Sequence, residues 1–302
     1  MEVGSKYEIG KSKSPFYLLQ LAIARKLVFT KWQEALGGNV QFIITGAAAM
    51  QPRLITLFTA AGIDIIEGYG LTETSPVLAC NRVNEKERCI GTVGIPLPGI
   101  DIKFAEDGEI LAKGDNIMKG YYNQPELTAE VIDKEGWFHT GDIGEWKMQN
   151  GYKFLKITDR KKELFKTAGG KYVAPQVLEN KMKESPYIEQ IMVVGGDDKK
   201  FVSALIIPAF SQLEEWATAN HINYKTKTEL TTNKEVIKLI HQEVKKYNTN
   251  FGHWEQIKKF VLLPEEWTVE SGELTPTMKP KRKIVNERYK MEIESMYKGE
   301  HE

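Results

Sequence analysis

The chain is poor in cysteine and histidine, and neither sign of charge is in excess. Its 302 residues include two cysteines and five histidines. Cys80 and Cys89 form no C-x-x-C pair, so we expect neither a disulfide framework nor a structural zinc site. Lysine plus arginine and aspartate plus glutamate both number 41. Because dedicated nucleic-acid binders usually carry excess positive charge, a DNA- or RNA-binding function is disfavoured.

Long apolar runs are also missing. No stretch approaches the roughly 18 apolar residues that span a bilayer, and the polar N-terminal segment is unlike a signal peptide. The apolar fraction of 41% still supports packed cores, and the length suggests about two domains. We therefore expect a soluble, cytoplasmic α/β protein. The sequence leaves a peripheral membrane contact and the oligomeric state open.

The N-terminal part has the pattern of a parallel α/β unit that extends to about residue 75. Residues 15–36 predict a helix, and β-branched runs at 40–45 and 63–66 predict strands on either side of a helix that begins at Pro52. Ligands tend to bind where parallel strands end. Two loops qualify, at residues 46–50 and 67–73.

The pattern of the sequence changes twice further along the chain, near residue 91 and again after residues 159–162. Frequent glycine and proline between short strands over 91–155 indicate a small antiparallel, β-barrel-like unit. Residues beyond the charged segment 159–162 indicate an α+β domain. Its predicted elements are helices from Pro175, at 211–221, at 233–248 and from 281, and strands at 191–194, 202–207 and 258–263. We predict one domain over 1–158 and a second over 159–302, with a hinge at 159–163.

The run Gly68-Tyr69-Gly70-Leu71-Thr72-Glu73 is the first candidate site. Its glycines let backbone approach a ligand closely. Tyr69 offers a flat face for a base, Thr72 a hydroxyl for a phosphate, and Glu73 a hard oxygen for Mg²⁺. A glycine-rich turn capped by Thr72 explains the same residues, and the run alone does not decide between the two.

Three further candidates are weaker when taken singly. Asp142, in a tight Thr-Gly-Asp turn, can accept hydrogen bonds from ribose hydroxyls, although an ordinary Asx turn is the commoner use. Arg160 could bind a phosphate or ribose, but its charged segment also fits a solvated surface followed by a hairpin. Lys279 precedes a predicted helix, where domain motion could carry it into a site. A basic surface patch is the alternative.

Together, in this order and spacing, the four motifs resemble the adenylate-forming acyl-CoA synthetase superfamily over essentially the whole chain. The stretches 91–99 and 118–128 add to the resemblance, and 172–176 and 274–279 resemble its long-chain fatty acid–CoA ligase branch. The resemblance implies an enzyme of fatty acid metabolism. Such an enzyme joins a fatty acid to ATP, releases pyrophosphate, and transfers the acyl group from acyl-AMP to CoA, with Mg²⁺ as the metal.

The resemblance also implies residue roles. Tyr69 would stack on adenine, Thr72 would contact the α-phosphate, and Glu73 would hold Mg²⁺. Asp142 would bind the ribose hydroxyls, and Lys279 would assist adenylation. The remaining implied positions are the nucleotide-site residues Gly46, Ala47, Ala48, Glu67, Gly68, Gly70, Arg160, Lys166 and Lys171, the pantetheine-tunnel residues Ala168 and Gly169, and the hinge residue Lys162, which is also placed near the nucleotide.

The chain departs from the family pattern in two respects. Val177 stands where many relatives carry an acidic residue. The family's phosphate loop ending in Pro-Lys-Gly occurs nowhere, and there is no G-x-x-x-x-G-K-[ST] substitute. We therefore expect the C-terminal half of a ligase, inactive alone. A ligase for another carboxylate and a non-catalytic nucleotide-binding module remain as alternatives, and the acyl chain length stays open.

Overall fold

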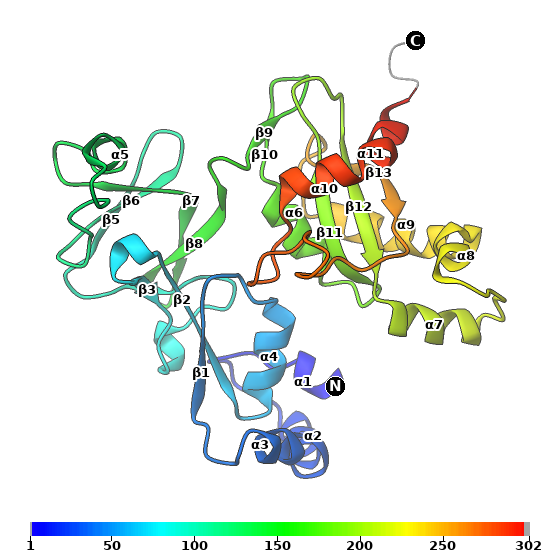
Figure 1. The fold of residues 1–302 in the computed structure, drawn as a ribbon. Helices are drawn as coiled ribbons and strands as arrows, with labels where there is room; N and C mark the ends of the chain where they lie inside the picture. The colour runs from blue at the N-terminus through cyan, green and yellow to red at the C-terminus, as the bar shows by residue number, and fades with distance from the viewer. Residues whose placement is uncertain (1, 299–302) are drawn as a thin grey trace. The chain divides into compact units, whose positions relative to one another are not determined.

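A boundary between Lys161 and Lys162 divides the chain into two compact units in the computed structural model, which describes residues 2–298 (Figure 1). We call them unit 1 (Met1–Lys161) and unit 2 (Lys162–Glu302). Both are mixtures of helices and sheets. Strand β8 (Tyr152–Arg160) carries unit 1 beyond residue 158, where the sequence placed the domain limit.

Unit 1 begins with helices that lead into a parallel strand pair. The predicted helix over 15–36 is confirmed as α2 (Pro15–Ala24), the π-helical η1 (Arg25–Phe29) and α3 (Thr30–Ala35), which follow one another directly. The expected strand–helix–strand unit is confirmed as β1 (Phe42–Thr45), α4 (Pro52–Ala60) and β2 (Asp64–Gly70), with β1 parallel to β2. A short helix α1 (Glu2–Ser5) packs near α4.

Strand β2 is longer than predicted, so residues 67–70 are strand and not loop. The second half of β2 pairs antiparallel with β3 (Val77–Cys80), which pairs with β4 (Ile95–Pro96) to complete the sheet order β1-β2-β3-β4. A Cβ on Gly70 would lie 1.6 Å from the carbonyl oxygen of Pro76, so this close approach requires glycine. The turn from β2 to β3 contains the 3-10 helix η2 (Thr72–Thr74).

The predicted antiparallel unit is confirmed, but as an open sheet. It consists of β5 (Asp101–Phe104), β6 (Glu109–Lys113), β7 (Phe138–Gln149) and β8, in that order. Within residues 2–298 no ladder joins β5 to β8, so the barrel-like expectation is wrong. Four strands are too few to close into a barrel whose interior holds side chains, which takes about eight. The short helices η3 (Glu85–Glu87) and α5 (Pro125–Val131) lie in the connections.

Unit 2 is the expected α+β domain. Its sheet has the order β11-β12-β13, with β11 (Ile188–Val194) antiparallel and β13 (Ile257–Leu262) parallel to β12 (Val202–Pro208). A short hairpin, β9 (Phe165–Lys166) and β10 (Tyr172–Val173), precedes it. The helices are α6 (Pro175–Met182), α7 (Phe210–Ala219), α8 (Lys227–Thr232), α9 (Lys234–Asn248), α10 (Arg282–Arg288) and α11 (Lys290–Tyr297).

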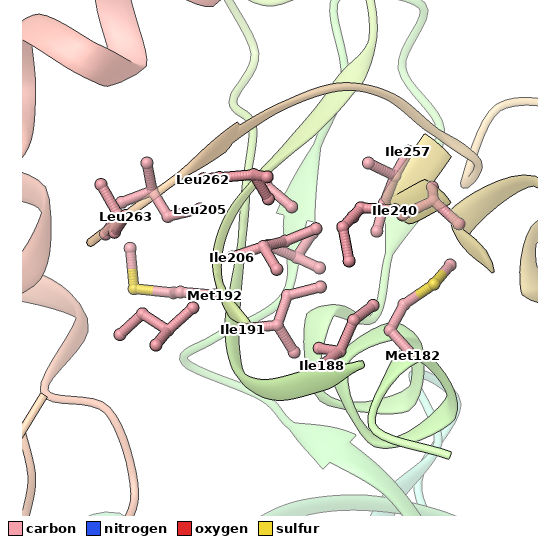
Figure 2. Packing of buried hydrophobic residues seen from close by; sticks show 14 of the residues in the cluster. Met182, Ile188, Ile191, Met192, Leu205, Ile206, Ile240, Ile257, Leu262 and Leu263 are labelled. Carbon is pink, nitrogen blue, oxygen red and sulfur yellow. The ribbon is translucent and has the colours of Figure 1, made fainter. Parts of the chain in front are cut away.

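The core of unit 2 lies on both faces of this sheet (Figure 2). Every residue of β12 is buried. Because neighbouring side chains on a strand point to opposite faces, Ile191 and Met192 enter different halves of the core (Figure 2). Met182 from α6 and Ile240 from α9 pack against one of these halves (Figure 2). No helix within residues 2–298 is both long and apolar enough to cross a membrane.

Candidate nucleotide site and lysine loops

The loop after β1 begins where the ladder between β1 and β2 ends. Thr45 and Glu67 are the last residues that these two strands pair with each other, and β2 continues to Gly70. A Cβ on Gly46 would lie 3.6 Å from the Gly68 carbonyl oxygen, so the loop passes directly over β2. The Ala48 amide donates to the Gly46 carbonyl at 2.7 Å, and Ala47 has a φ of 61°. Such a γ-turn with a positive φ is strained, and strain of this kind concentrates at functional sites.

Glu67 is buried beneath this loop. Its side chain accepts a hydrogen bond from the Met50 amide at 3.4 Å, and the residue is 6% exposed. Burial raises the pKa of Glu67 from 4.5 to about 7, against the smaller opposing effect of the Met50 and Gly91 amides. Its carboxyl group can therefore donate as well as accept a hydrogen bond near neutral pH.

Three residues named from the sequence meet in unit 1. The Tyr69 hydroxyl donates to Asp142 Oδ2 at 2.7 Å, and Arg160 Nε lies 3.7 Å from Asp142 Oδ1. Tyr69 and Asp142 are each 8% exposed. Burial and then the Asp142 charge raise the pKa of Tyr69 above its usual 10, so the phenol is a neutral donor. The ring of Tyr69 packs in a core cluster with Leu78 and Ala79.

Asp142 is held in a β-bulge and not in the tight turn expected from the sequence. Glu109 of β6 pairs with Ile143 of β7, whereas Leu111 pairs with His139, so β7 carries extra residues between these pairs. Bulges of this kind redirect side chains beside active sites. The Thr140 hydroxyl donates to the Ile110 carbonyl at 2.8 Å and accepts from the Asp142 amide at 3.1 Å. Alternation breaks at the bulge, which is why the sequence missed β7.

Thr72 and Glu73 lie in η2, at the end of β2. Thr72 is exposed, and the cap expected from it is made by Thr74, whose hydroxyl accepts from the Leu71 amide at 2.9 Å. Glu73 Oε1 accepts from the Tyr121 hydroxyl at 2.9 Å. The sequence flagged the stretch around Tyr121 but gave no signal for this contact.

The side chains around Glu73 limit the kind of metal ion that this part of the chain could bind. No group of three or more histidine, cysteine, aspartate or glutamate side chains within residues 2–298 is arranged to hold a metal ion. A lone carboxylate such as that of Glu73 fits Mg²⁺, which is usually held by one or two carboxylates together with phosphates and water. It does not fit a closed structural site.

In unit 2, the expected lysines and glycines form a hairpin. The Thr167 amide donates to the Lys171 carbonyl at 3.0 Å, and Ala168 and Gly169 are exposed at the tip. Lys166 Nζ lies 4.7 Å from the Tyr172 ring centroid, and Lys171 Nζ lies 5.7 Å from that of Trp254. Both ammonium groups can thus be held by aromatic faces near the hairpin.

Lys279 lies in a closed loop immediately before α10. Its amide donates to the Thr275 hydroxyl at 3.0 Å, and its carbonyl accepts from the Thr275 amide at 2.8 Å. Met278 has a φ of 61°, which tightens the turn. The loop therefore fixes the backbone of Lys279, and the side chain is half-buried. Lys162, the expected hinge residue, is exposed at the start of unit 2.

Arg282 is not part of a basic surface patch, the alternative considered for its segment. Its guanidinium donates to Glu163 at 3.0 Å, to Glu179 at 2.6 Å and to the Val193 carbonyl at 3.0 Å. It thus ties the start of unit 2 to α6 and β11. Glu179, a buried partner that the sequence did not indicate, lies one turn into α6. Three acceptors in different directions suit the fixed fork of donors on a guanidinium, which lysine lacks.

Comparison with known proteins identifies both units. Residues 15–122 match the AMP-binding enzyme family, and residues 163–301 match the AMP-binding enzyme C-terminal domain. Long-chain-fatty-acid–CoA ligase FadD15 of Mycobacterium tuberculosis is 42% identical over 280 residues, which cover 92% of this chain and 46% of that protein. Human long-chain-fatty-acid–CoA ligase 1 is 37% identical over 286 residues, covering 90% and 40%. The chain thus spans about half the length of these curated relatives.

Solved structures have the same fold. The adenylation domain of a carboxylate reductase from Mycobacterium chelonae matches with a TM-score of 0.69 at 23% identity, over 98% of this chain and 43% of that one. The A domain of the Segniliparus rugosus carboxylic acid reductase, solved with AMP and a co-purified carboxylic acid, matches with 0.67 at 23%, over 95% and 43%. With both family models matched in order along the chain, and with curated relatives at 37–42% identity, this chain belongs to the AMP-binding enzyme family.

Proposed function

We propose that this chain is the C-terminal part of an AMP-forming long-chain fatty acid–CoA ligase. The complete enzyme activates a fatty acid as acyl-AMP and passes the acyl group to CoA. The observation that carries the proposal is the Tyr69–Asp142–Arg160 cluster beside the strained loop after β1. The fatty acid and CoA are inferred from the curated relatives, whose names identify them as ligases for these substrates.

The cluster in unit 1 provides groups that suit a nucleotide. Asp142 has about four lone-pair sites and can accept from ribose hydroxyls while it accepts from Tyr69. Tyr69 is proposed to present its ring to adenine, with Arg160 close to the ribose. The loop residues Gly46, Ala47 and Ala48 and the strand residues Glu67, Gly68 and Gly70 would line the base. Thr72 would contact the α-phosphate.

Glu73 is the residue proposed to hold Mg²⁺. When bound with ATP, the ion would neutralise charge on the phosphates. The hydrogen bond from the Tyr121 hydroxyl keeps the Glu73 side chain oriented for this. Tyr121 is therefore proposed as a residue that positions Glu73.

Unit 2 is proposed to supply the mobile groups. Attack by the carboxylate adds negative charge to the α-phosphate oxygens, which the ammonium of Lys279 would stabilise. Thiol attack needs that lysine replaced by a channel for pantetheine, for which Ala168 and Gly169 at the hairpin tip are the candidates. Lys166 and Lys171 would lie near the nucleotide or the thioester. A single rotation about a hinge at 159–163, centred on Lys162, supplies both arrangements.

The proposal that the chain is only part of the enzyme rests on an apolar face of unit 1. We define the N-terminal apolar face as Phe16, Leu19, Ile23, Leu27 and Ile44. Phe16 is 70% exposed and Ile44 is 66% exposed. Parallel strands are normally covered on both faces, yet no residue of β1 is buried. The occupant we propose is the remaining part of the ligase, because the curated relatives are more than twice as long.

The test compares the complete enzyme with residues 1–302. Each is incubated with ATP, CoA and a panel of long-chain, medium-chain and aryl acids, and acyl-CoA and AMP are quantified. We expect long-chain acyl-CoA with equimolar AMP from the complete enzyme and none from residues 1–302, which lack a phosphate loop. A preference for aryl acids would replace the substrate assignment. Turnover by residues 1–302 above a no-enzyme control would show that nothing essential is missing.

A further inference from the structure

Glu109 and Lys161, which have no role assigned so far, both form hydrogen bonds to the β-bulge that carries Asp142. Glu109 Oε1 accepts from the Gly141 amide at 2.9 Å, and the Lys161 amide donates to the Gly141 carbonyl at 2.8 Å. Lys161 Nζ also reaches Glu109 Oε2 at 2.8 Å and Asp107 Oδ2 at 2.7 Å. Both polar groups of the Gly141 backbone are therefore held by one ion-paired unit.

The conformation at Gly141 explains why it needs holding. Its φ of 72° lies in the left-handed region, which glycine adopts at little cost but leaves just as easily. Asp142 is the next residue, so rotation at Gly141 would redirect the Asp142 carboxylate. Two hydrogen bonds that fix the Gly141 amide and carbonyl remove this freedom and set the direction of the carboxylate.

Glu109 is a costly residue to place here, which argues for more than a chance contact. It is 4% exposed, and a buried carboxylate is tolerated only when it is paired and hydrogen-bonded. Lys161, the Gly141 amide and His139 Nδ1, at 3.1 Å, supply these partners. The pair of Glu145 with Lys156, at 2.7 Å in the same sheet, serves as a comparison. Both of its side chains are well exposed, whereas the Glu109 carboxylate is buried and also accepts from the Gly141 amide.

We propose that Glu109 and Lys161 are positioning residues of the nucleotide site, which hold the Gly141 bulge so that the Asp142 carboxylate faces the ribose. The inference rests on the proposed ribose role of Asp142. Neither residue touches the nucleotide; both act through Gly141. Lys161 is also the last residue of unit 1, so these contacts hold the chain at the residue directly before Lys162, the centre of the proposed hinge.

The experiment uses the complete enzyme and measures its preference for ATP over 2′,3′-dideoxy-ATP, as the ratio of kcat/KM. The variants are Glu109→Ala, Glu109→Gln and Lys161→Met, with Asp142→Ala as reference and Glu145→Gln as matched control. We expect Asp142→Ala to abolish the preference and Glu109→Ala to lower it about tenfold, through the KM for ATP. Glu109→Gln should keep part of it, because the amide oxygen still accepts from Gly141. Glu145→Gln should behave like the unchanged enzyme.

A merely structural role predicts a different pattern. The KM values for ATP and dideoxy-ATP would then rise together, or stability would fall with the preference intact, and either result overturns the proposal. Lys161→Met keeps the backbone hydrogen bond to Gly141 and changes a side chain that is half-exposed. It therefore measures the effect of losing the Lys161–Glu109 ion pair on the ATP preference, even if Glu109→Ala fails to fold. An enzyme that makes no acyl-CoA would contradict the proposed function instead. Calorimetry with AMP and 2′,3′-dideoxy-AMP on the same variants would still show whether Glu109 and Lys161 affect the preference for a nucleotide with ribose hydroxyls.

Discussion

The two units bury their apolar side chains in different ways. Unit 2 has one continuous core that contains five of the seven residues of β12 and reaches from Val173 in β10 to Tyr297 in α11. Unit 1 instead has three separate, smaller clusters. Many of the exposed large apolar side chains of unit 1 lie on α2, η1 and β1, and they include those of the N-terminal apolar face.

This difference indicates which unit is a domain in its own right. A single core of this extent can compensate for the loss of chain entropy on folding. Several small clusters beside a wide exposed apolar surface are typical of part of a larger domain. In unit 1 the residues proposed for nucleotide binding therefore stand on strands whose stability depends on what covers the N-terminal apolar face.

The largest expected effect is on folding of the separated units. Residues 162–302 expressed alone should unfold in one cooperative step in urea, because their core contains no contribution from unit 1. Residues 1–161 should show no cooperative transition and should aggregate, since the N-terminal apolar face is open. Circular dichroism and sedimentation check both outcomes.

A matched pair of variants sharpens this comparison. Ile44→Lys places a charge on the N-terminal apolar face and should reduce the aggregation of residues 1–161. Ile237→Lys, at a 40% exposed position in unit 2, should change nothing in residues 162–302. Cooperative folding of residues 1–161 without such changes would show that unit 1 needs no further covering.

The order of elements was predictable wherever periodicity is strong. The helix over 15–36, the β1–α4–β2 unit and the strands β11, β12 and β13 of unit 2 followed from apolar spacing and from glycine and proline at their ends. The predictions failed where a strand depends on a partner that is distant in the sequence. Strand β2 continues through Gly68 and Gly70 because β3 pairs with them, and no local pattern reveals that partner. Strand β7 was missed because its bulge breaks the alternation, and the open sheet because closure is a property of the whole sheet.

The candidate site was predictable as residue types, but its contacts were not. Motif spacing pointed to Tyr69, Asp142 and Arg160, which the structure brings together from three strands. Glu109 and Lys161 gave no signal, because an acidic residue after a turn and a lysine in a charged run are common on surfaces. Their importance depends on burial and on the backbone of Gly141, which only the folded chain reveals.

The junction between the units offers the next test. Proline at position 162 locks φ near −65° and removes an amide donor, so Lys162→Pro should freeze one domain arrangement in the complete enzyme. One half-reaction should then collapse towards background while the other survives, with the melting temperature little changed. Acyl-AMP formation and thioester formation from supplied acyl-AMP are measured separately. Lys162→Ala is the control for loss of the side chain, and unimpaired overall turnover of the proline variant would move the hinge to Asp159 or Glu163.

A smaller effect should follow from the lysine loop of unit 2. Lys279→Ala in the complete enzyme should slow acyl-AMP formation by about 10² to 10³, the usual cost of one transition-state contact. Thioester formation from supplied acyl-AMP should stay nearly normal, since this step does not use the ammonium. Lys283→Ala, on the exposed side of α10, is the control and should leave both steps unchanged. Equal losses in both half-reactions would assign Lys279 a structural role.

The smallest expected effect concerns Glu67 and is confined to unit 1. Its pKa is raised to about 7 by burial, against 4.5 for an exposed glutamate. The folded state therefore binds more protons than the unfolded state between these values, and the contribution of Glu67 to stability is lost as pH rises through 7. The difference corresponds to at most about 3 kcal/mol.

Glu67→Gln removes this titration. In the complete enzyme, the variant should match the unchanged protein near pH 4.5 and should melt at a higher temperature at pH 8, where the buried carboxylate of the unchanged protein is ionised. Only the transition that includes unit 1 should move, because Glu67 packs beneath the loop after β1 and makes its contacts within that unit. Glu145→Gln, exposed on β7, should leave the pH profile unaltered. Scanning calorimetry between pH 4.5 and 8 measures both variants, and a stability difference that does not change with pH would mean that Glu67 is ionised throughout this range.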